Sequence, residues 1–475
     1  MKQLSFLIVV TALGAVGAMA SSFWAVMLYY SFAVLRPQAI WAWALPTNLR
    51  WSLIAALLLV VSCVIHGPRL LKTLRFNPVI VLMIAYTVWL LWSMLMAFDP
   101  YVAEQWGVEY AKVIFVAVLA SFIVERYWHV RALSVMIAIA LGYIAWEINF
   151  MYFFEHRRLD VYHIGFGGLD NNGAGLMLAM GLPFAYALLF LPKKMSWSWV
   201  RWLGLPIAVL LVHAVMMTYS RGAMLAALVG LGWLAAHHRP RWQAAGGVLA
   251  LCLVIGMLAG PQIRGRFYST TDYHHDASAT ARLDSWGAAW KMVWDEPLFG
   301  HGIRNASRFI GSYGADRAGR TIHSQYLQIA ADSGLPAAMT YIAMLAVAFG
   351  SLRLARRRCL QALTDSPTRL TDDIESVEHL GHIWLATETG LVIFAFGGLF
   401  LSMEMFELPY LLLMFAGVSP MLTQLHIENA IARGERRKKQ QQDAGDPHAQ
   451  GRRLAGRFRP HPVLVPAPAK LGDHH

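Results

Sequence analysis

Charged residues and cysteine are scarce in this sequence. Only 14% of its 475 residues are charged, against about a quarter in soluble domains, whereas 57% are hydrophobic. This balance excludes a soluble enzyme and a disordered chain. Three cysteines are too few for a disulfide framework, which excludes a small secreted scaffold, and we expect no disulfide. The apolar runs also lack the two-residue alternation of a transmembrane β-barrel.

The apolar residues instead lie in continuous runs of helix length. A membrane-spanning helix needs about 20 mostly apolar residues. If the first run is counted as one long or broken span, there are twelve runs: 3–35, 49–66, 79–97, 107–125, 128–148, 173–192, 200–218, 221–236, 243–260, 335–352, 384–402 and 409–426. We therefore predict an all-α polytopic membrane protein with about 12 transmembrane helices.

Basic residues are concentrated on one side of the predicted spans. Most of the 40 Lys and Arg residues lie in five short loops and in the C-terminal tail, which share a side when the spans alternate. Because such loops face the cytoplasm, we predict a multi-pass membrane protein with both termini cytoplasmic. The same rule accounts for the net charge of +12 without a nucleic-acid partner.

The N-terminal run raises the question of a signal peptide, because Ala18-Met19-Ala20 is typical of a cleavage site. Cleavage there would place every later basic loop on the outer side of the membrane, so we favour an uncleaved first span. The predicted division is helices 1–9 at 1–260, a periplasmic loop domain with short helices at 261–334, helices 10–12 at 335–426, and a basic, disordered cytoplasmic tail at 427–475.

The long outer segment 261–334 is rich in arginine, which outnumbers lysine there by seven to one. One interpretation is the solvated surface of a loop domain, because long loops escape the orientation rule. The other is an anionic substrate, since arginine forms bidentate pairs with phosphate. An arginine-rich loop over a membrane bundle favours a lipid diphosphate.

Arg221 lies where two predicted spans join tightly, in the segment Thr218-Tyr219-Ser220-Arg221-Gly222. This position puts the guanidinium at the outer membrane boundary. An arginine there either extends its charge into water while its stem stays in the bilayer, or binds an anion.

Arg282 shares one predicted helical face with Trp286 and Trp290, at a spacing of four residues. The simpler interpretation is an amphipathic helix anchored on the membrane surface by tryptophan. A glycine-rich turn, Pro297-Leu298-Phe299-Gly300-His301-Gly302, follows it.

His323 lies close to a predicted helix start, with Thr321 as the N-cap and Gly334 as the stop. In the first turn, the positive end of the helix disfavours imidazolium, so His323 would be neutral and able to accept a proton. The alternative is a structural histidine.

Together these residues resemble the motifs of the O-antigen ligase superfamily. Arg221 with Leu225 resembles the R-x3-L motif of that family, and His323-Ser324, nine residues and Gly334 resemble its H-[N/S/Q]-x9-G motif. The glycine-rich turn and the span count agree with the family. The early segment LRPQAIWAW resembles the N-terminal region of O-glycosylation ligases that accompany exosortase systems, and Asp170-Asn171-Asn172 is similar to a segment found there.

The resemblance implies an inverting, metal-independent glycosyltransferase of GT-C-like architecture with no cofactor. It implies that His323 activates the acceptor hydroxyl, while Arg221 and Arg282 hold the diphosphate. The donor would be a glycan on undecaprenyl diphosphate, and the acceptor the lipid A-core of lipopolysaccharide on the periplasmic side. Further donor or acceptor contacts would come from Arg264, Arg266, Asn172, Tyr219, His301 and Arg304.

Three other interpretations stay open. A protein O-oligosaccharyltransferase or a polysaccharide polymerase would use the same donor, and a transporter or flippase would need binding alone.

The cluster Asp272-Tyr273-His274-His275-Asp276 offers metal ligands, although a flexible polar loop has the same composition. Within a span, Glu109 and Lys112 are spaced to neutralise each other.

Overall fold

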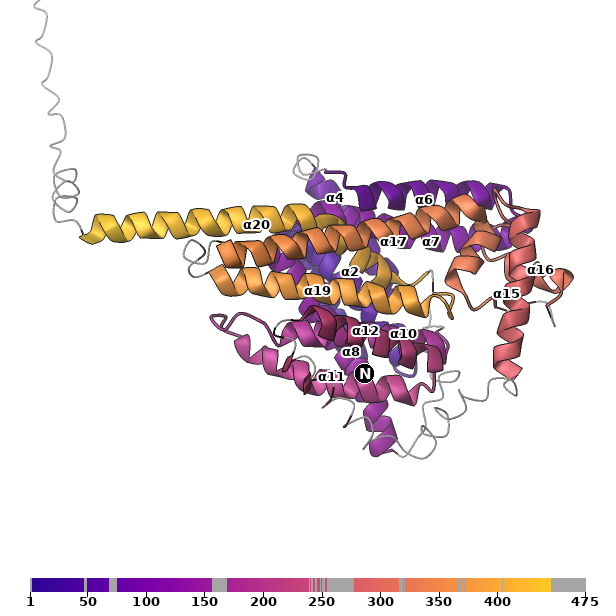
Figure 1. Ribbon diagram of the computed structural model, residues 1–475, viewed down its shortest axis with the longest axis horizontal. Helices are drawn as coiled ribbons and strands as arrows, with labels where there is room; N and C mark the ends of the chain where they lie inside the picture. Colours follow the sequence, from indigo (N-terminus) through magenta and orange to yellow (C-terminus); the bar gives the residue numbers. More distant parts are fainter. Residues whose placement is uncertain are drawn as a thin grey trace, which may run out of the picture.

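The structure is a computed structural model. It describes residues 2–46, 49–67, 75–155, 169–238, 277–315, 321–365, 373–403 and 405–445, together with a few single positions between them. The described chain is a bundle of helices whose axes run roughly parallel in Figure 1, with α15 standing across one end of it.

The helices begin and end as follows: α1 (Lys2–Ala20), α2 (Ser22–Leu35), α3 (Pro37–Ile40), α4 (Trp51–Ile65), α6 (Pro78–Leu95), α7 (Pro100–Ile123), α8 (Tyr127–Phe153), α10 (Asn171–Leu188), α11 (Gly204–Met217), α12 (Arg221–His237), α15 (Ala277–Asp295), α16 (Ala306–Phe309), α17 (Gln325–Asp365), α19 (Ile374–Gly397) and α20 (Glu407–Gly445). Two short 3-10 helices, η1 (Ser198–Leu203) and η3 (Ile310–Tyr313), complete the set.

Eight candidate spans among the described residues are long and apolar enough to cross a membrane: α1, α6, α7, α8, η1 with α11, α17, α19 and α20. The helices α4 and α12 are apolar but shorter. The chain is therefore a multi-pass, all-helical membrane protein in the part described, as the apolar runs predicted. The run predicted at 243–260 lies almost wholly outside the described residues, so the count of 12 stays a prediction.

Several helices begin at a side-chain cap that the sequence makes recognisable. Asn77, Asp99, Asp170 and Ser220 each accept a hydrogen bond from a backbone N–H of the first turn that follows. In α6 and α7 a proline occupies the first turn, where its missing N–H costs no helical hydrogen bond. These caps explain why the apolar runs begin as helices where they do.

The first apolar run is a helical hairpin, and the prediction of one span over 3–35 is wrong. Chain reversal occurs at Ser21, whose side chain caps α2. Glycines allow α1 and α2 to pack closely: a Cβ on Gly14 would lie 2.8 Å from Leu28, and one on Gly17 would lie 2.9 Å from Trp24. Close packing through small residues is a common way for membrane helices to associate.

The hairpin brings the start of α1 back beside the end of α2. Lys2 and Leu35 line one cavity, and Phe6 contacts Trp41 edge-on at a centroid distance of 6.0 Å. At the other end of the hairpin, the Ser62 hydroxyl of α4 donates to the Ala18 carbonyl at 2.7 Å. Because residues from 446 lie outside the described part, the prediction that both termini lie on one side stays a prediction.

The bundle has two distinct ends. The basic end carries the short connections rich in Lys and Arg, including Arg126 before α8, Lys193 after α10 and Arg353 in α17. The loop end carries the first residues of α10 and α12, the break in α17, and all of α15 and α16 (Figure 1). The described basic loops thus share one end, as the parity of the spans predicted.

The last helix is longer than the sequence indicated. A disordered tail was predicted from 427, but α20 continues to Gly445 and extends beyond the other helices in Figure 1. Its later turns are rich in Glu, Arg, Lys and Gln, which are strong helix formers. Arg433 also ties this part to the bundle, because its Nε lies 3.0 Å from the Asp373 carboxylate. Residues from 446 lie outside the described part.

One local prediction is confirmed. Glu109 and Lys112 form an ion pair on α7 at 2.8 Å. Cys63 and Cys359 are both free thiols, and Cys252 lies outside the described residues.

Candidate functional site

The loop end is organised around a break in α17. Helical geometry is interrupted at Gly334, whose φ is 82°, as predicted from the stop signal there. A Cβ at this position would overlap the carbonyl oxygen of Leu298, so a glycine is required for two separate reasons. The Leu335 N–H donates to the Pro297 carbonyl at 2.8 Å, which joins the break to the glycine-rich turn.

The glycine-rich turn at 297–302 lies against this break. The His301 N–H donates to the Ala331 carbonyl at 3.0 Å, and the Gly302 N–H donates to the Asp332 carbonyl at 2.8 Å. Gly300 has a φ of 63°, and a Cβ there would lie 2.5 Å from the Asp332 backbone. Two segments that were singled out separately in the sequence are therefore one structural unit.

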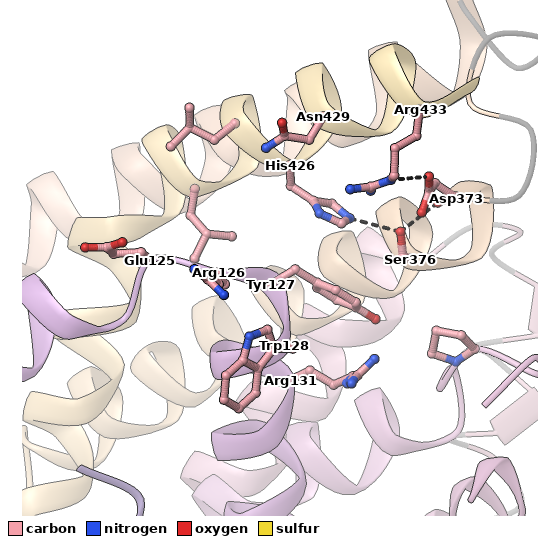
Figure 2. Close-up of a pocket in the computed structure, with 13 residues that line it drawn as sticks. Glu125, Arg126, Tyr127, Trp128, Arg131, Asp373, Ser376, His426, Asn429 and Arg433 are labelled. Atoms are coloured by element: carbon pink, nitrogen blue, oxygen red, sulfur yellow. Dashed lines mark hydrogen bonds and ion pairs between the residues drawn. The ribbon is translucent and has the colours of Figure 1, made fainter. Parts of the chain in front are cut away.

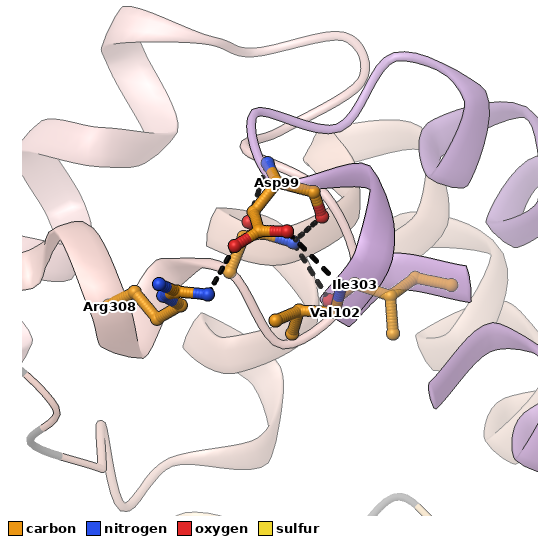
Figure 3. A network of polar contacts seen from close by, with 5 residues as sticks. Asp99, Val102, Ile303 and Arg308 are labelled. Carbon is orange, nitrogen blue, oxygen red and sulfur yellow. Dashed lines mark hydrogen bonds and ion pairs between the residues drawn. The ribbon is translucent and has the colours of Figure 1, made fainter. Parts of the chain in front are cut away.

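Asp99 connects this unit to the start of α7. Its carboxylate accepts from the Val102 N–H and forms an ion pair with Arg308 (Figure 3). Its backbone N–H donates to the Asn305 side chain at 2.9 Å, and Asn305 donates back to the Asp99 carbonyl at 3.2 Å. These contacts hold the segment between α15 and α17 against the transmembrane helices.

Asp332 is the second carboxylate that holds the loop end together. It is buried, and its two oxygens accept from the Ala306 N–H at 2.8 Å and from the Gln328 side chain at 2.7 Å. Sequence reasoning missed Asp99, Asn305 and Asp332. Only Asp99 had a local signal, because an Asp-Pro pair before an apolar run is typical of a helix start.

His323 lies outside the helix to which it was assigned. α17 begins at Gln325, and the Ser324 carbonyl accepts the first helical hydrogen bond, from Gln328 at 2.8 Å. His323 itself is half-buried and has a φ of 56°, a rare conformation for a residue that is not glycine. The prediction of a first-turn position with Thr321 as N-cap is therefore wrong. The backbone is held elsewhere, because the Gln325 N–H donates to the Gly398 carbonyl at 2.8 Å.

Arg221 is the first residue of α12, at the loop end, as the join between two spans predicted. The preceding residue, Ser220, is the N-cap, and its hydroxyl also donates to the Asn172 side chain at 2.7 Å. Asn171 donates to the Thr218 carbonyl at 3.2 Å, so the start of α10 and the start of α12 are held together. The structure thus places Asn172 beside the turn that carries Arg221.

Tyr219 has a φ of 54° and is half-buried in the same turn. The turn is tight because the Thr218 and Ala223 side chains both approach the Gly175 backbone, where a Cβ would lie 2.7 Å from each. A positive φ at Tyr219 reverses the chain between α11 and α12 within three residues.

The residues after α19 link the two motifs. Gly398 accepts from the start of α17, two residues after His323. Phe400 packs on the other motif, because a Cβ on Gly222 would lie 3.6 Å from the Phe400 Cβ. Two motifs that are about 100 residues apart in the sequence therefore flank the same end of α19.

Arg282 lies on α15, which crosses the loop end in Figure 1. The packed face of this helix is formed by Ser285, Ala288, Ala289, Met292 and Val293. Arg282 and Trp286 are half-buried beside that face, whereas Trp290 is exposed. That Arg282, Arg221 and His323 line one cavity stays a prediction.

His301 is fully buried and takes part in packing. Its Nε2 lies 2.9 Å from the Tyr313 hydroxyl, which in turn donates to Asp295, so His301 donates to Tyr313. Burial lowers the pKa of His301, so the imidazole is neutral at neutral pH. Burial and the hydrogen bond to Asp295 raise the pKa of Tyr313 to about 12.

Arg304 also has a positive φ, of 62°, and its guanidinium lies over the Trp106 ring at 4.9 Å. This stacking joins the loop segment to α7. Arg264, Arg266 and the cluster Asp272–Asp276 lie outside the described residues, so the predicted donor contacts and the metal alternative at those positions stay untested.

A second ion pair at the loop end, besides Asp99 with Arg308, was not predicted from the sequence. Arg36 and Glu407 lie 3.8 Å apart and line a cavity of about 260 Å³ between α2, α4 and α20. Arg36 also lies over the Phe406 ring at 5.6 Å. A signal was present, because Arg36 and Glu407 are ionisable residues at the ends of predicted spans, where such groups are costly and often functional.

Fold and site together define a multi-pass membrane protein whose irregular polar site lies at one end of a helical bundle. Residues 206–342 match the family model described as O-antigen ligase. The matched part includes Arg221, Arg282 and His323, so this region of the chain is similar to the O-antigen ligase family, as the motifs predicted. No curated protein sequence matches the chain. The family supports glycan transfer of the ligase or polymerase type as the activity.

Proposed function

We propose that the protein is a glycosyltransferase that moves an O-antigen-type glycan from undecaprenyl diphosphate to the lipid A-core of lipopolysaccharide. The loop end would face the periplasm, and the membrane would be the bacterial inner membrane. The observation that carries the proposal is that the Arg221 and His323 motifs of the matched family flank the same end of α19.

The chemistry follows from what each residue type can do. In the proposed step, an acceptor hydroxyl oxygen bonds to the anomeric carbon while the bond from that carbon to the diphosphate breaks. The His323 imidazole takes the hydroxyl proton, and the bond electrons leave with undecaprenyl diphosphate. Arg221 and Arg282 would stabilise the negative charge that develops on the leaving group. Direct displacement of this kind inverts the anomeric carbon.

Arginines at the leaving group supply the positive charge that a divalent cation supplies in other enzymes. Transfer is therefore expected to continue in excess EDTA. Loss of transfer on chelation, with recovery on adding one divalent ion, would contradict this part of the proposal and would favour the cluster at Asp272–Asp276.

The test is transfer by the purified full chain in detergent, with a labelled glycan on undecaprenyl diphosphate. Three acceptors are compared: lipid A-core, an acceptor protein, and a second donor molecule. Labelled lipopolysaccharide supports the proposal. Label in protein or in longer glycan chains would assign the oligosaccharyltransferase or polymerase activity instead, and no transfer to any acceptor would contradict a transferase.

Arg221→Lys tests the role of the guanidinium. Loss of a phosphate-binding arginine costs about 2–5 kcal/mol, which corresponds to a loss of transfer of roughly 30-fold to several thousand-fold. Lysine keeps the charge but loses the bidentate fork. Arg50→Lys is the matched control, because Arg50 is exposed at the start of α4, also at the loop end. Equal transfer by both variants would contradict diphosphate binding by Arg221.

A further inference from the structure

The basic end contains a cavity of about 450 Å³ where α8, α19 and α20 meet (Figure 2). Its lining consists of Glu125, Arg126, Tyr127, Trp128, Arg131, Pro192, Asp373, Ser376, Leu422, Leu425, His426, Asn429 and Arg433. Pockets for small molecules commonly have volumes of about 300–1,000 Å³. This cavity lies at the opposite end of the bundle from Arg221 and His323, so the proposed transferase does not use it.

Three arginines contribute positive charge to the lining. Arg126 is exposed at the N-cap of α8, where its side chain makes no capping hydrogen bond. Arg131 lies about one turn further along α8, with its guanidinium 5.2 Å from the centre of the Tyr127 ring and 5.6 Å from that of Trp197. Stacking on aromatic rings holds a guanidinium in place while leaving its edge N–H groups as donors.

The two carboxylates in the lining offset only part of this charge. Asp373 accepts from the Nε of Arg433 at 3.0 Å. In Figure 2 the Glu125 carboxylate points away from the other labelled residues. His426 bonds to Ser376 through Nε2 at 2.9 Å. Arg126 and Arg131 therefore face the cavity without a carboxylate of their own in it.

Apolar side chains form the rest of the lining. They include Trp128 of α8 and both Leu422 and Leu425 of α20. A ligand with a phosphate and an acyl chain matches both the basic and the apolar residues of the lining. Basic pockets between transmembrane helices at the cytoplasmic side bind anionic headgroups.

From these observations we propose that the cavity binds a glycerol phosphate ester, presented either as the headgroup of an anionic phospholipid or as a soluble molecule. The guanidinium groups of Arg126 and Arg131 contact the phosphate oxygens. The Asn429 side chain offers a further donor on the α20 side. Because α8, α19 and α20 all contribute to the lining, a bound ligand stabilises the packing of these three helices.

The test measures the thermal unfolding of the purified full chain in a non-ionic detergent, with native mass spectrometry of the bound ligand. The probes are dioctanoyl phosphatidylglycerol, dioctanoyl phosphatidylcholine and glycerol 3-phosphate. Stabilisation by phosphatidylglycerol alone identifies a lipid headgroup as the ligand. Equal stabilisation by glycerol 3-phosphate identifies a soluble phosphate ester. Stabilisation by neither, or equal stabilisation by phosphatidylcholine, would overturn the proposal.

Variants locate the effect in the cavity. Arg126→Gln and Arg131→Gln are each expected to weaken phosphatidylglycerol binding about fivefold, since an arginine near an anionic headgroup contributes about a factor of that size. Arg126 is exposed, so its replacement is compatible with folding even if that of Arg131 is not. Arg201→Gln is the matched control, because Arg201 lies at the same end, stacked on Trp202 at 4.9 Å, outside the lining.

Asp373→Asn separates binding from a purely structural role. It removes a negative charge from the lining and releases Arg433, so binding should tighten about fivefold. If the cavity has only a structural role, the loss of this ion pair leaves binding unchanged or weakens it. Unchanged or weaker binding by Asp373→Asn, or an equal loss in Arg201→Gln, would contradict the proposal.

Discussion

At the loop end the backbone leaves helical geometry repeatedly, whereas at the basic end it stays in regular helices and side chains carry the polar contacts. Every residue with a positive φ that the structure describes lies at the loop end: Arg36, Tyr219, Gly300, Gly302, Arg304, Gly314, Gly319, His323 and Gly334. Strained backbone of this kind persists only where surrounding contacts hold it, and it is concentrated at functional sites.

The basic end buries polar groups without such strain. The Tyr186 hydroxyl lies 2.6 Å from Nδ1 of His238 and 2.8 Å from Nδ1 of His382. Glu388 is fully buried and forms ion pairs with Arg353 at 3.1 Å and Arg356 at 2.5 Å. Pairing of this kind satisfies ionisable groups inside a bundle. The comparison agrees with the proposal that the loop end performs chemistry, while the interior of the basic end holds helices together.

The sharpest test of this comparison is the loss of one histidine at each end. His323→Ala should reduce transfer by roughly 10²–10⁴-fold if His323 is the general base, while thermal unfolding changes little. His237→Ala, which removes a histidine bonded to the Trp233 carbonyl near the basic end, should keep transfer. Rates are measured with the labelled donor. Near-normal transfer by His323→Ala would reduce that motif to a structural element.

Glu388→Gln should have the reverse pattern, with a large effect on stability and a small one on chemistry. Removing one partner of a buried ion pair typically costs about 3–5 kcal/mol, because the remaining charge is left without its partner. The expected result is a lower unfolding temperature with unchanged transfer per folded molecule. A large loss of transfer in protein that remains fully folded would contradict the separation of the two ends.

Gly334→Ala tests whether the strained backbone at the break is needed. Alanine there combines a positive φ with a steric overlap, so we expect destabilisation of about 1–3 kcal/mol and reduced transfer. Gly350→Ala is a matched control in the same helix, because a Cβ at Gly350 meets nothing within 4 Å. That variant should be neutral or more stable by up to about 1 kcal/mol. Equal effects of the two variants would show that the break is not required.

The smallest expected effect is on the pH dependence of the free energy of unfolding, and it comes from His301 at the loop end. Since burial lowers the pKa of His301 in the folded state, the unfolded chain takes up the proton first as the pH falls. Stability should therefore decrease below the ordinary histidine pKa, by at most about 1.4 kcal/mol per pH unit. His301→Gln should make the unfolding temperature less dependent on pH between about 7.5 and 5.5. An unchanged pH dependence would mean that His301 does not titrate on unfolding.

Most elements of the bundle were predictable because apolar runs and helix caps are local signals. The runs at 79–97 and 128–148 correspond to α6 and α8, and the caps at Asn77 and Asp99 mark where helices begin. The prediction of a single span over 3–35 was wrong because nothing in the hydropathy of this run distinguishes one long span from two antiparallel helices. That choice depends on the contacts of Gly14 and Gly17 with α2.

The residues of the candidate site were easier to predict than their arrangement in space. Arg221 and His323 were recognisable as motif residues, and the O-antigen ligase match covers both. The conformation of His323 was not recognisable, because the backbone beside it is held at Gln325 by Gly398, which is far away in the chain. The roles of Asp99 and Asp332 were missed for the same reason, since each carboxylate has a partner that is distant in the chain: Asp99 pairs with Arg308, and Asp332 accepts from Ala306.

By itself, the sequence determined that this is a helical membrane protein with one basic end and one arginine-rich loop. Hydropathy and charge act residue by residue and do not depend on how the helices pack. The tertiary structure decided that α1 and α2 form a hairpin, that the glycine-rich turn and the break in α17 form one unit, and that the two motifs flank the end of α19. These features depend on contacts between distant segments, which form only when the helices are assembled.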